Sequence, residues 1–199
     1  MAKPKSGVTV PRRATVMILF AEVRGFTRVA GGIEPSIVLA RAAEFFALVA
    51  ATVERRAGAV FSVLNDTLMA TFEGEHAAQH AVQSAQEIRR DFTILKAAWQ
   101  QDHDIRAAVA MGLHGGDVAI GGGGPVPDQV LMVGDSVSVA GHLMRRARAG
   151  EFVVSAMIMD ALAASRFPLE AKELPPFKIP PREPLRIFGV LLETRLDFN

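Results

Sequence analysis

The sequence predicts an α+β fold whose core runs strand, helix, strand, strand, helix, strand. Three observations carry this prediction. The run 15–21 is apolar at every position after its first residue, as expected of a strand covered on both faces. Two long segments, 35–56 and 78–99, carry apolar residues at helical spacing. Between them, two short apolar runs flank the polar pair Asn65 and Asp66, which is typical of a tight hairpin.

The first strand and the first long helix are bounded by residues that favour turns. The strand is expected to end at Glu22, and a glycine turn follows at Gly25. Pro35 suits the first turn of the helix, because its missing N–H would have no partner there, and Gly58 stops the helix. Glu22 is therefore expected at the rim of a buried sheet.

The remaining elements complete the order. The hairpin strands are expected over 59–64 and 67–72, and the next strand over 105–113. Together these elements form a ferredoxin-like βαββαβ core, followed by a C-terminal α/β extension. In such a core the first strand neighbours the hairpin, so Glu22 and Asp66 could meet at one edge although they are far apart in the chain.

Composition excludes several classes of protein. The chain of 199 residues suits a single domain over 14–199, preceded by a flexible tail over 1–13. Half of the residues are apolar and the net charge is +1, which argues against disorder and against binding nucleic acid through overall charge. The absence of cysteine excludes disulfides and zinc-thiolate sites, and it fits a cytoplasmic location. We expect no membrane segment, since no run approaches the roughly 20 apolar residues that a span requires.

Two carboxylates that converge at the edge of a sheet are typical of a divalent-metal site. Hard oxygen ligands favour Mg²⁺ or Mn²⁺, and Mg²⁺ usually brings a phosphate substrate with it. Glu22 and Asp66 are the candidates for this pair.

At this point the sequence resembles a known family, the class III nucleotidyl cyclases, which convert ATP or GTP into the 3′,5′-cyclic nucleotide and pyrophosphate. The resemblance covers about residues 14–191 and implies the cyclase fold and a role in cyclic-nucleotide signalling. A final strand over 185–188 is the weakest part of the match. Four segments carry it in the family's order, namely 20–27, 65–72, 113–118 and 133–140.

The resemblance implies that this chain keeps the metal half of the site. The family holds two metal ions with two aspartates; Asp66 matches the second, and Glu22 replaces the first with a side chain one methylene longer. The backbone of Val23 would be a further ligand. The phosphates of the nucleotide would lie against three residues of the glycine turn, Gly25, Phe26 and Thr27.

The complementary half has changed at all four positions that the resemblance assigns. Ser62 and Leu131 stand where the family reads the base, so they do not indicate adenine or guanine. Ser138 and His142 stand where the family has an asparagine and an arginine that stabilise the transferring phosphoryl group. The fixed guanidinium fork is absent from position 142.

Family members act as dimers whose sites lie between chains, so several functions stay open for this one. A homodimer could be a weak or inactive cyclase, or it could react with Mn²⁺ and a protonated His142. The chain could instead be a regulatory or nucleotide-binding pseudocyclase that forms a heterodimer with another cyclase. A purely structural dimerisation domain is the third possibility.

Three further features are expected to have structural rather than functional roles. His114 lies in an apolar run and is expected to be structural, and the glycines over 121–124 are expected to form a hairpin loop. Arg145, Arg146 and Arg148 are expected at a solvated helix end, with contact to a phosphate or to RNA as the alternative.

Overall fold

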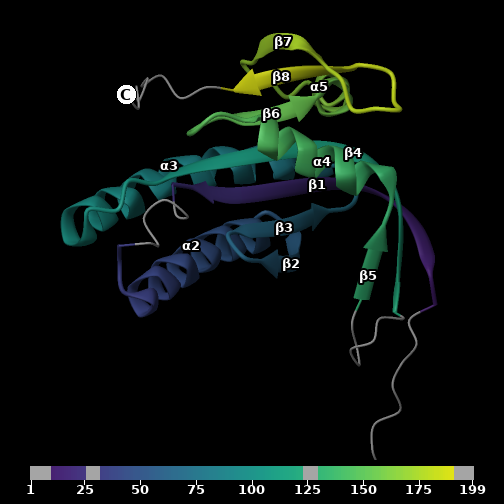
Figure 1. Cartoon of the computed structure of the whole chain (residues 1–199). Helices are drawn as coiled ribbons and strands as arrows, with labels where there is room; N and C mark the ends of the chain where they lie inside the picture. Colours follow the sequence, from purple (N-terminus) through teal and green to yellow (C-terminus); the bar gives the residue numbers. More distant parts are fainter. Residues whose placement is uncertain (1–9, 26–31, 123–129, 191–199) are drawn as a thin grey trace, which may run out of the picture.

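The computed structural model describes residues 10–25, 32–122 and 130–190. Its centre is one mixed sheet with the strand order β2-β3-β1-β4-β6-β8-β7, and β5 pairs with β4 (Figure 1). The strands are β1 (Arg12–Arg24), β2 (Gly58–Leu64), β3 (Thr67–Phe72), β4 (Ala108–Gly122), β5 (Val130–Val133), β6 (Phe152–Ser155), β7 (Lys172–Phe177) and β8 (Leu185–Val190). The helices are α2 (Pro35–Arg55), α3 (Ala77–His103), α4 (Asp135–Arg146) and α5 (Ala156–Ala164). The predicted α+β class and core order are confirmed.

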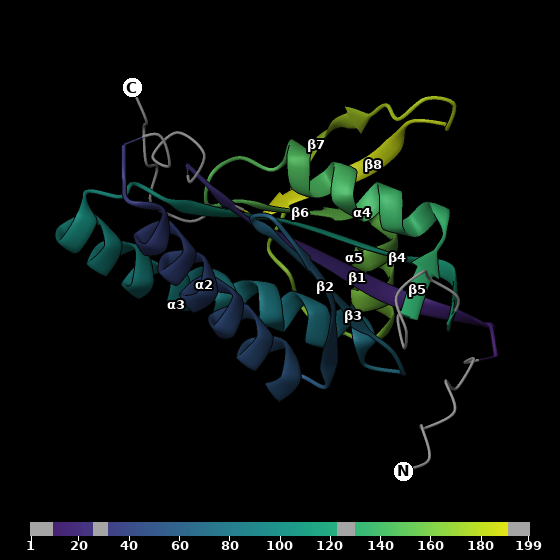
Figure 2. The same cartoon turned by 60° about the horizontal axis from the view of Figure 1, so that its bottom comes forward.

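The helices cover the sheet from both sides (Figures 1 and 2). On one face, α2 and α3 enclose the main core, in which Phe92 packs edge-on against both Phe45 and Trp99. On the opposite face, α4 packs through Val139 and Leu143 against the strands β4, β6 and β8. The sheet is thus the middle layer of three.

The strand β1 shows why its sequence lacks alternation. Leu19 and Ala21 belong to the core under α2 and α3, whereas Val16 and Ile18 are buried with Ala140 of α4. Both faces are therefore apolar. The strand extends further than expected, because it begins at Arg12 and continues to Arg24. Our expectation that Glu22 follows the end of this strand is wrong: Glu22 lies inside it.

The hairpin and the long helices occur where the sequence predicts them. Pro35 begins α2, and the Glu34 carboxylate caps it by accepting a hydrogen bond of 3.0 Å from the Ser36 N–H. The turn Asn65-Asp66 joins β2 to β3, with Asn65 at a left-handed φ of 55°. This hairpin lies beside β1, through pairing of β3 with β1.

The later elements differ from the expectation in their bounds. The strand expected over 105–113 is β4, which begins at Ala108 and continues to Gly122. The glycine loop expected over 121–124 therefore begins in a strand, and the rest of it lies outside the described residues. Pro175 and Pro176 belong to the edge strand β7, where a missing N–H costs little.

By length and composition alone, α2 could cross a membrane, with a mean hydropathy of 1.8 over its most apolar window. This differs from our expectation that no run of the sequence approaches the length of a membrane span. A core helix of a soluble domain passes the same test, and α2 places Phe45, Val49 and Val53 in the main core.

Candidate functional site

The first predicted ligand, Glu22, lies in the middle of the sheet. Its backbone pairs with Thr67 of β3 on one side and with Ala110 of β4 on the other. By the alternation of the strand, Glu22 shares a face with Ile18 and Phe20, which is the face that α4 covers. Its side chain is only 17% exposed. A carboxylate is thus held in a largely dry position beside α4.

The second predicted ligand, Asp66, is brought to this position by the hairpin. The Val23 N–H donates a hydrogen bond of 3.2 Å to the Asp66 carbonyl, which ties the turn to β1. Thr67 Oγ1 donates to Asp66 Oδ1 at 3.3 Å. The charge of Asp66 also raises the pKa of Glu22. The hairpin therefore brings Asp66 beside Val23, the neighbour of Glu22, and a shared metal role for these residues stays a prediction.

Arg24 is a site residue that the sequence reasoning missed. It follows Glu22 by two positions, so both side chains lie on the same face of β1. Its guanidinium donates to the carbonyl oxygens of Met144, at 3.1 Å, and Arg145, at 3.3 Å. These carbonyls end α4, and Arg24 therefore joins the last turn of that helix to β1. The strand period alone could have identified it.

One oxygen of the Glu22 carboxylate lacks a hydrogen-bond partner in the described part of the chain. Within the described ranges, Oε2 is buried and accepts no hydrogen bond. Arg24 Nη2 lies 3.1 Å from it, which makes an ion pair by distance but without the alignment of a hydrogen bond. Burial raises the pKa of Glu22 above its ordinary value, and Asp66 raises it further, while Arg24 and Arg145 oppose this. A buried carboxylate oxygen that accepts no hydrogen bond is suited to binding a cation.

Replacing Glu22 by glutamine is expected to stabilise the folded chain at neutral pH. Because the folded-state pKa is raised, this group contributes stability below the ordinary glutamate pKa and loses it as pH rises through the raised value. Glutamine has no charge to desolvate, so the melting temperature of Glu22→Gln should exceed that of the wild type at pH 7, and the gap should close at about pH 4. The exposed Glu170 offers a control, Glu170→Gln, that should change little. A lower melting temperature for Glu22→Gln at pH 7 would show that the pairing with Arg24 outweighs burial.

The other predicted residues are not gathered with the two carboxylates. Ser138 is exposed on α4, and His142 is half-buried one turn later. Ser62 lies on the edge strand β2, and Leu131, 40% exposed, lies on β5, which pairs only with β4. Their predicted roles require a second chain and stay predictions.

The glycine turn is only partly described. Gly25 has a φ of 96°, and a Cβ there would lie 2.4 Å from the Arg106 carbonyl oxygen, so no other residue fits. Phe26 and Thr27, predicted to contact the phosphates, lie outside the described residues.

His142 contacts the side chain one turn later on α4. Arg145 Nη2 lies 3.2 Å from His142 Nδ1. A guanidinium can only donate, so Nδ1 is the acceptor of this hydrogen bond. Arg145 is exposed in the last turn of α4, as expected, and its charge lowers the pKa of Glu22 against the effect of burial. His114 is structural, as predicted: its Nδ1 lies 2.8 Å from Ser155 Oγ, and burial, aided by Arg182, lowers its pKa to about 4.

A metal ion at this edge would need ligands beyond the protein. No cluster of three or more acidic or histidine side chains suited to a metal occurs in the described part of the chain. Two carboxylates are nevertheless the usual protein share of a Mg²⁺ site, in which water and substrate phosphates complete the shell. Together with the unsatisfied Glu22 oxygen, the donor set fits an ion that arrives with a phosphate ligand.

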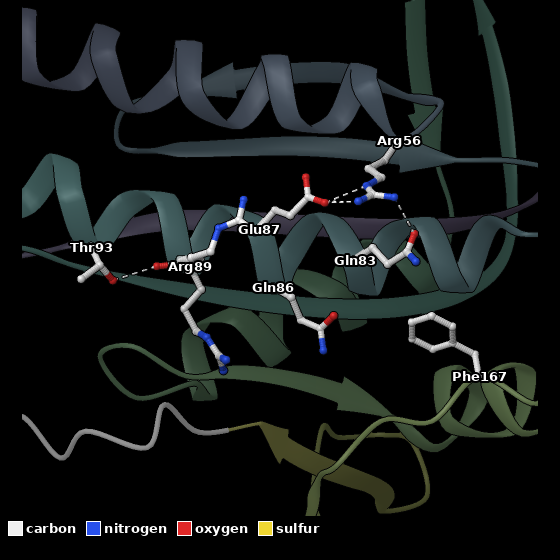
Figure 3. A pocket seen from close by; sticks show the side chains of 8 residues that line it. Arg56, Gln83, Gln86, Glu87, Arg89, Thr93 and Phe167 are labelled. Carbon is white, nitrogen blue, oxygen red and sulfur yellow. Dashed lines mark hydrogen bonds and ion pairs between the residues drawn. The ribbon is translucent and has the colours of Figure 1, made fainter.

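A separate hollow of about 650 Å³ lies on the helix layer opposite α4 (Figure 3). It is lined mainly by α3, with Arg56 after α2 and Phe167 after α5. The Arg56 guanidinium is already bonded to Glu87, at 2.9 Å, and to Gln83, at 3.1 Å. None of the predicted site residues lines this hollow, so it is distinct from the carboxylate edge.

Comparisons with known proteins agree with the resemblance. The sequence model of the family described as the adenylate and guanylate cyclase catalytic domain matches residues 8–188. The crystal structure of the adenylyl cyclase CyaB from P. aeruginosa superposes with a TM-score of 0.84 at 18% identity, covering 96% of this chain and 100% of that one. The guanylate cyclase domain of RhGC from Catenaria anguillulae, solved with GTP, gives 0.78 at 17% identity and covers 89% and 97%. No curated protein matches the chain.

Proposed function

We propose a ligand for this chain, which belongs to the family of adenylate and guanylate cyclase catalytic domains. It binds a nucleoside triphosphate together with Mg²⁺ or Mn²⁺ at Glu22 and Asp66. The buried Glu22 oxygen without a hydrogen bond, beside Asp66, is the observation that carries this proposal. Related domains were solved with GTP and with an ATP analogue, which supports a triphosphate as the ligand class.

Glu22, Asp66 and the backbone of Val23 would hold the metal, whose chemistry is to neutralise and polarise the phosphate oxygens. The chain's own contribution is positioning. The bond from the Val23 N–H to the Asp66 carbonyl keeps the two carboxylates together, and the burial of Glu22 excludes water from its oxygen. The tight approach of Gly25 to Arg106 fixes the backbone immediately after β1 at Gly25.

We further propose that a homodimer of this chain cyclises its ligand slowly or not at all. Ser138 and His142 offer neutral groups where phosphoryl transfer is aided by fixed positive charge. The chain would then serve by binding nucleotide, or by lending its metal half to a more complete cyclase in a heterodimer.

The test is a titration of purified protein with ATP and with GTP, in Mn²⁺ and in EDTA, followed by calorimetry and by thermal melting. We expect binding that weakens at least about tenfold without metal, and a melting temperature that rises with ligand because only the folded form binds. A cyclase assay on the same sample should give little product. A folded protein that binds neither nucleotide at millimolar concentration would overturn the proposal and leave the structural dimerisation role.

A further inference from the structure

Arg145 lies against the carboxylate edge of its own chain. It is in the last turn of α4, and its guanidinium folds back over Gly141: a Cβ built on Gly141 would lie 3.9 Å from Arg145 Nη1 and 3.9 Å from the ring of Phe20. Phe20 precedes Glu22 by two residues on β1 and shares its face.

Arg24 joins Arg145 to Glu22. Its Nη2 donates to the Arg145 carbonyl at 3.3 Å and lies 3.1 Å from Glu22 Oε2. Yet within the described ranges no carboxylate lies at ion-pair distance from Arg145, in contrast to Arg24, which pairs with Glu22 at 3.1 Å. The hydrogen bond of Arg145 to a side chain is the one to His142 Nδ1 at 3.2 Å. A guanidinium has five N–H donors, so this one bond orients it and leaves donors for a ligand.

We propose that Arg145 binds phosphate oxygens of the nucleoside triphosphate held at Glu22 and Asp66 of the same chain, with His142 as the residue that positions its guanidinium. This inference rests on the proposed function, since it concerns the same ligand. It goes further by placing a cation in the metal half of the site, where the sequence motifs assign only carboxylates and backbone. The planar fork of arginine suits phosphate oxygens better than an ammonium group does.

The same placement predicts opposite effects on two ligands. A guanidinium near two carboxylates repels a bare cation but attracts a polyphosphate. In Arg145→Gln, Mn²⁺ without nucleotide should therefore bind at least about twofold more tightly. The triphosphate with Mn²⁺ should bind about 10- to 100-fold more weakly, because charge-assisted hydrogen bonds are lost.

The experiment measures both constants for the wild type and three variants: Mn²⁺ by electron paramagnetic resonance, and ATP with Mn²⁺ by calorimetry. Arg146→Gln is the matched control, because it removes the same charge from the next residue of α4, rotated by about 100°; both constants should stay within about twofold of the wild type. Arg145→Lys keeps the charge but loses the fork, so its affinity for ATP should be intermediate. It also guards against a failure of Arg145→Gln to fold.

The outcomes separate this inference from the proposed function. If the wild type binds ATP with Mn²⁺ and Arg145→Gln binds it equally well, Arg145 makes no phosphate contact and only this inference fails. Equal losses in Arg145→Gln and Arg146→Gln would overturn it too, since a general charge effect would explain both. A wild type that binds no triphosphate overturns the proposed function, and this inference with it.

Discussion

Replacing Gly112 by alanine is expected to destabilise the chain by about 3 kcal/mol and to disorganise the carboxylate edge. Gly112 lies on β4 directly under α4, where an added Cβ would be 2.1 Å from the Met144 backbone nitrogen and 2.6 Å from the Ala140 carbonyl oxygen. These atoms belong to a helix backbone and cannot rotate away, so the helix itself must shift, which places the cost at the upper end for overpacking. The melting temperature should fall by about 6–12 °C.

The chain offers a matched control in Gly141 of α4. A Cβ there would meet its nearest neighbours only at 3.9 Å, which is ordinary contact. Because alanine also favours the helix over glycine by up to about 1 kcal/mol, Gly141→Ala should be neutral or slightly stabilising. Gly112→Ala should in addition weaken nucleotide binding, since Arg145 follows the displaced Met144. Equal melting temperatures for the two variants would show that α4 does not depend on close approach to β4.

Replacing Asp66 by asparagine is expected to reduce the metal-dependent affinity for nucleotide by at least about 100-fold. Loss of a residue that merely orients a ligand already costs about 10- to 100-fold in metal affinity, and removal of a carboxylate ligand should cost at least the upper figure. Asparagine keeps the volume of the side chain and can still accept from Thr67, so the hairpin should survive. Calorimetry with ATP and Mn²⁺ measures the loss, and circular dichroism checks the fold.

The control is Asp91→Asn, which removes the same charge from a half-buried aspartate of α3, on the opposite layer. It should leave nucleotide affinity within about twofold of the wild type, because Asp91 pairs with the exposed Arg90 on that layer, and such ion pairs near the surface contribute little. If Asp66→Asn retained full affinity in Mn²⁺, the nucleotide would have to bind elsewhere than at the Glu22 and Asp66 edge.

Much of the carboxylate edge could be predicted because its causes are local. The unbroken apolar run of β1 requires cover on both faces, and the pair Asn65-Asp66 between two apolar runs requires a tight turn. In a core with this order of elements, the hairpin pairs with β1 through β3, and this pairing places Asp66 near Glu22. The sequence predicts the end of β1 too early, because a glutamate ordinarily ends an apolar strand, whereas Glu22 is accommodated inside it, beside Arg24.

The family, the order of elements and the pairing of the hairpin with β1 follow from apolar periodicity, turn residues and four ordered motifs. The charges around Glu22 and Asp66 depend instead on tertiary packing. Arg145 looks in the sequence like any basic residue at a helix end; its carbonyl is joined to Glu22 through Arg24 because Gly112 lets α4 lie against β4. Such a contact depends on the packing distance between a helix and a sheet, which no local pattern records.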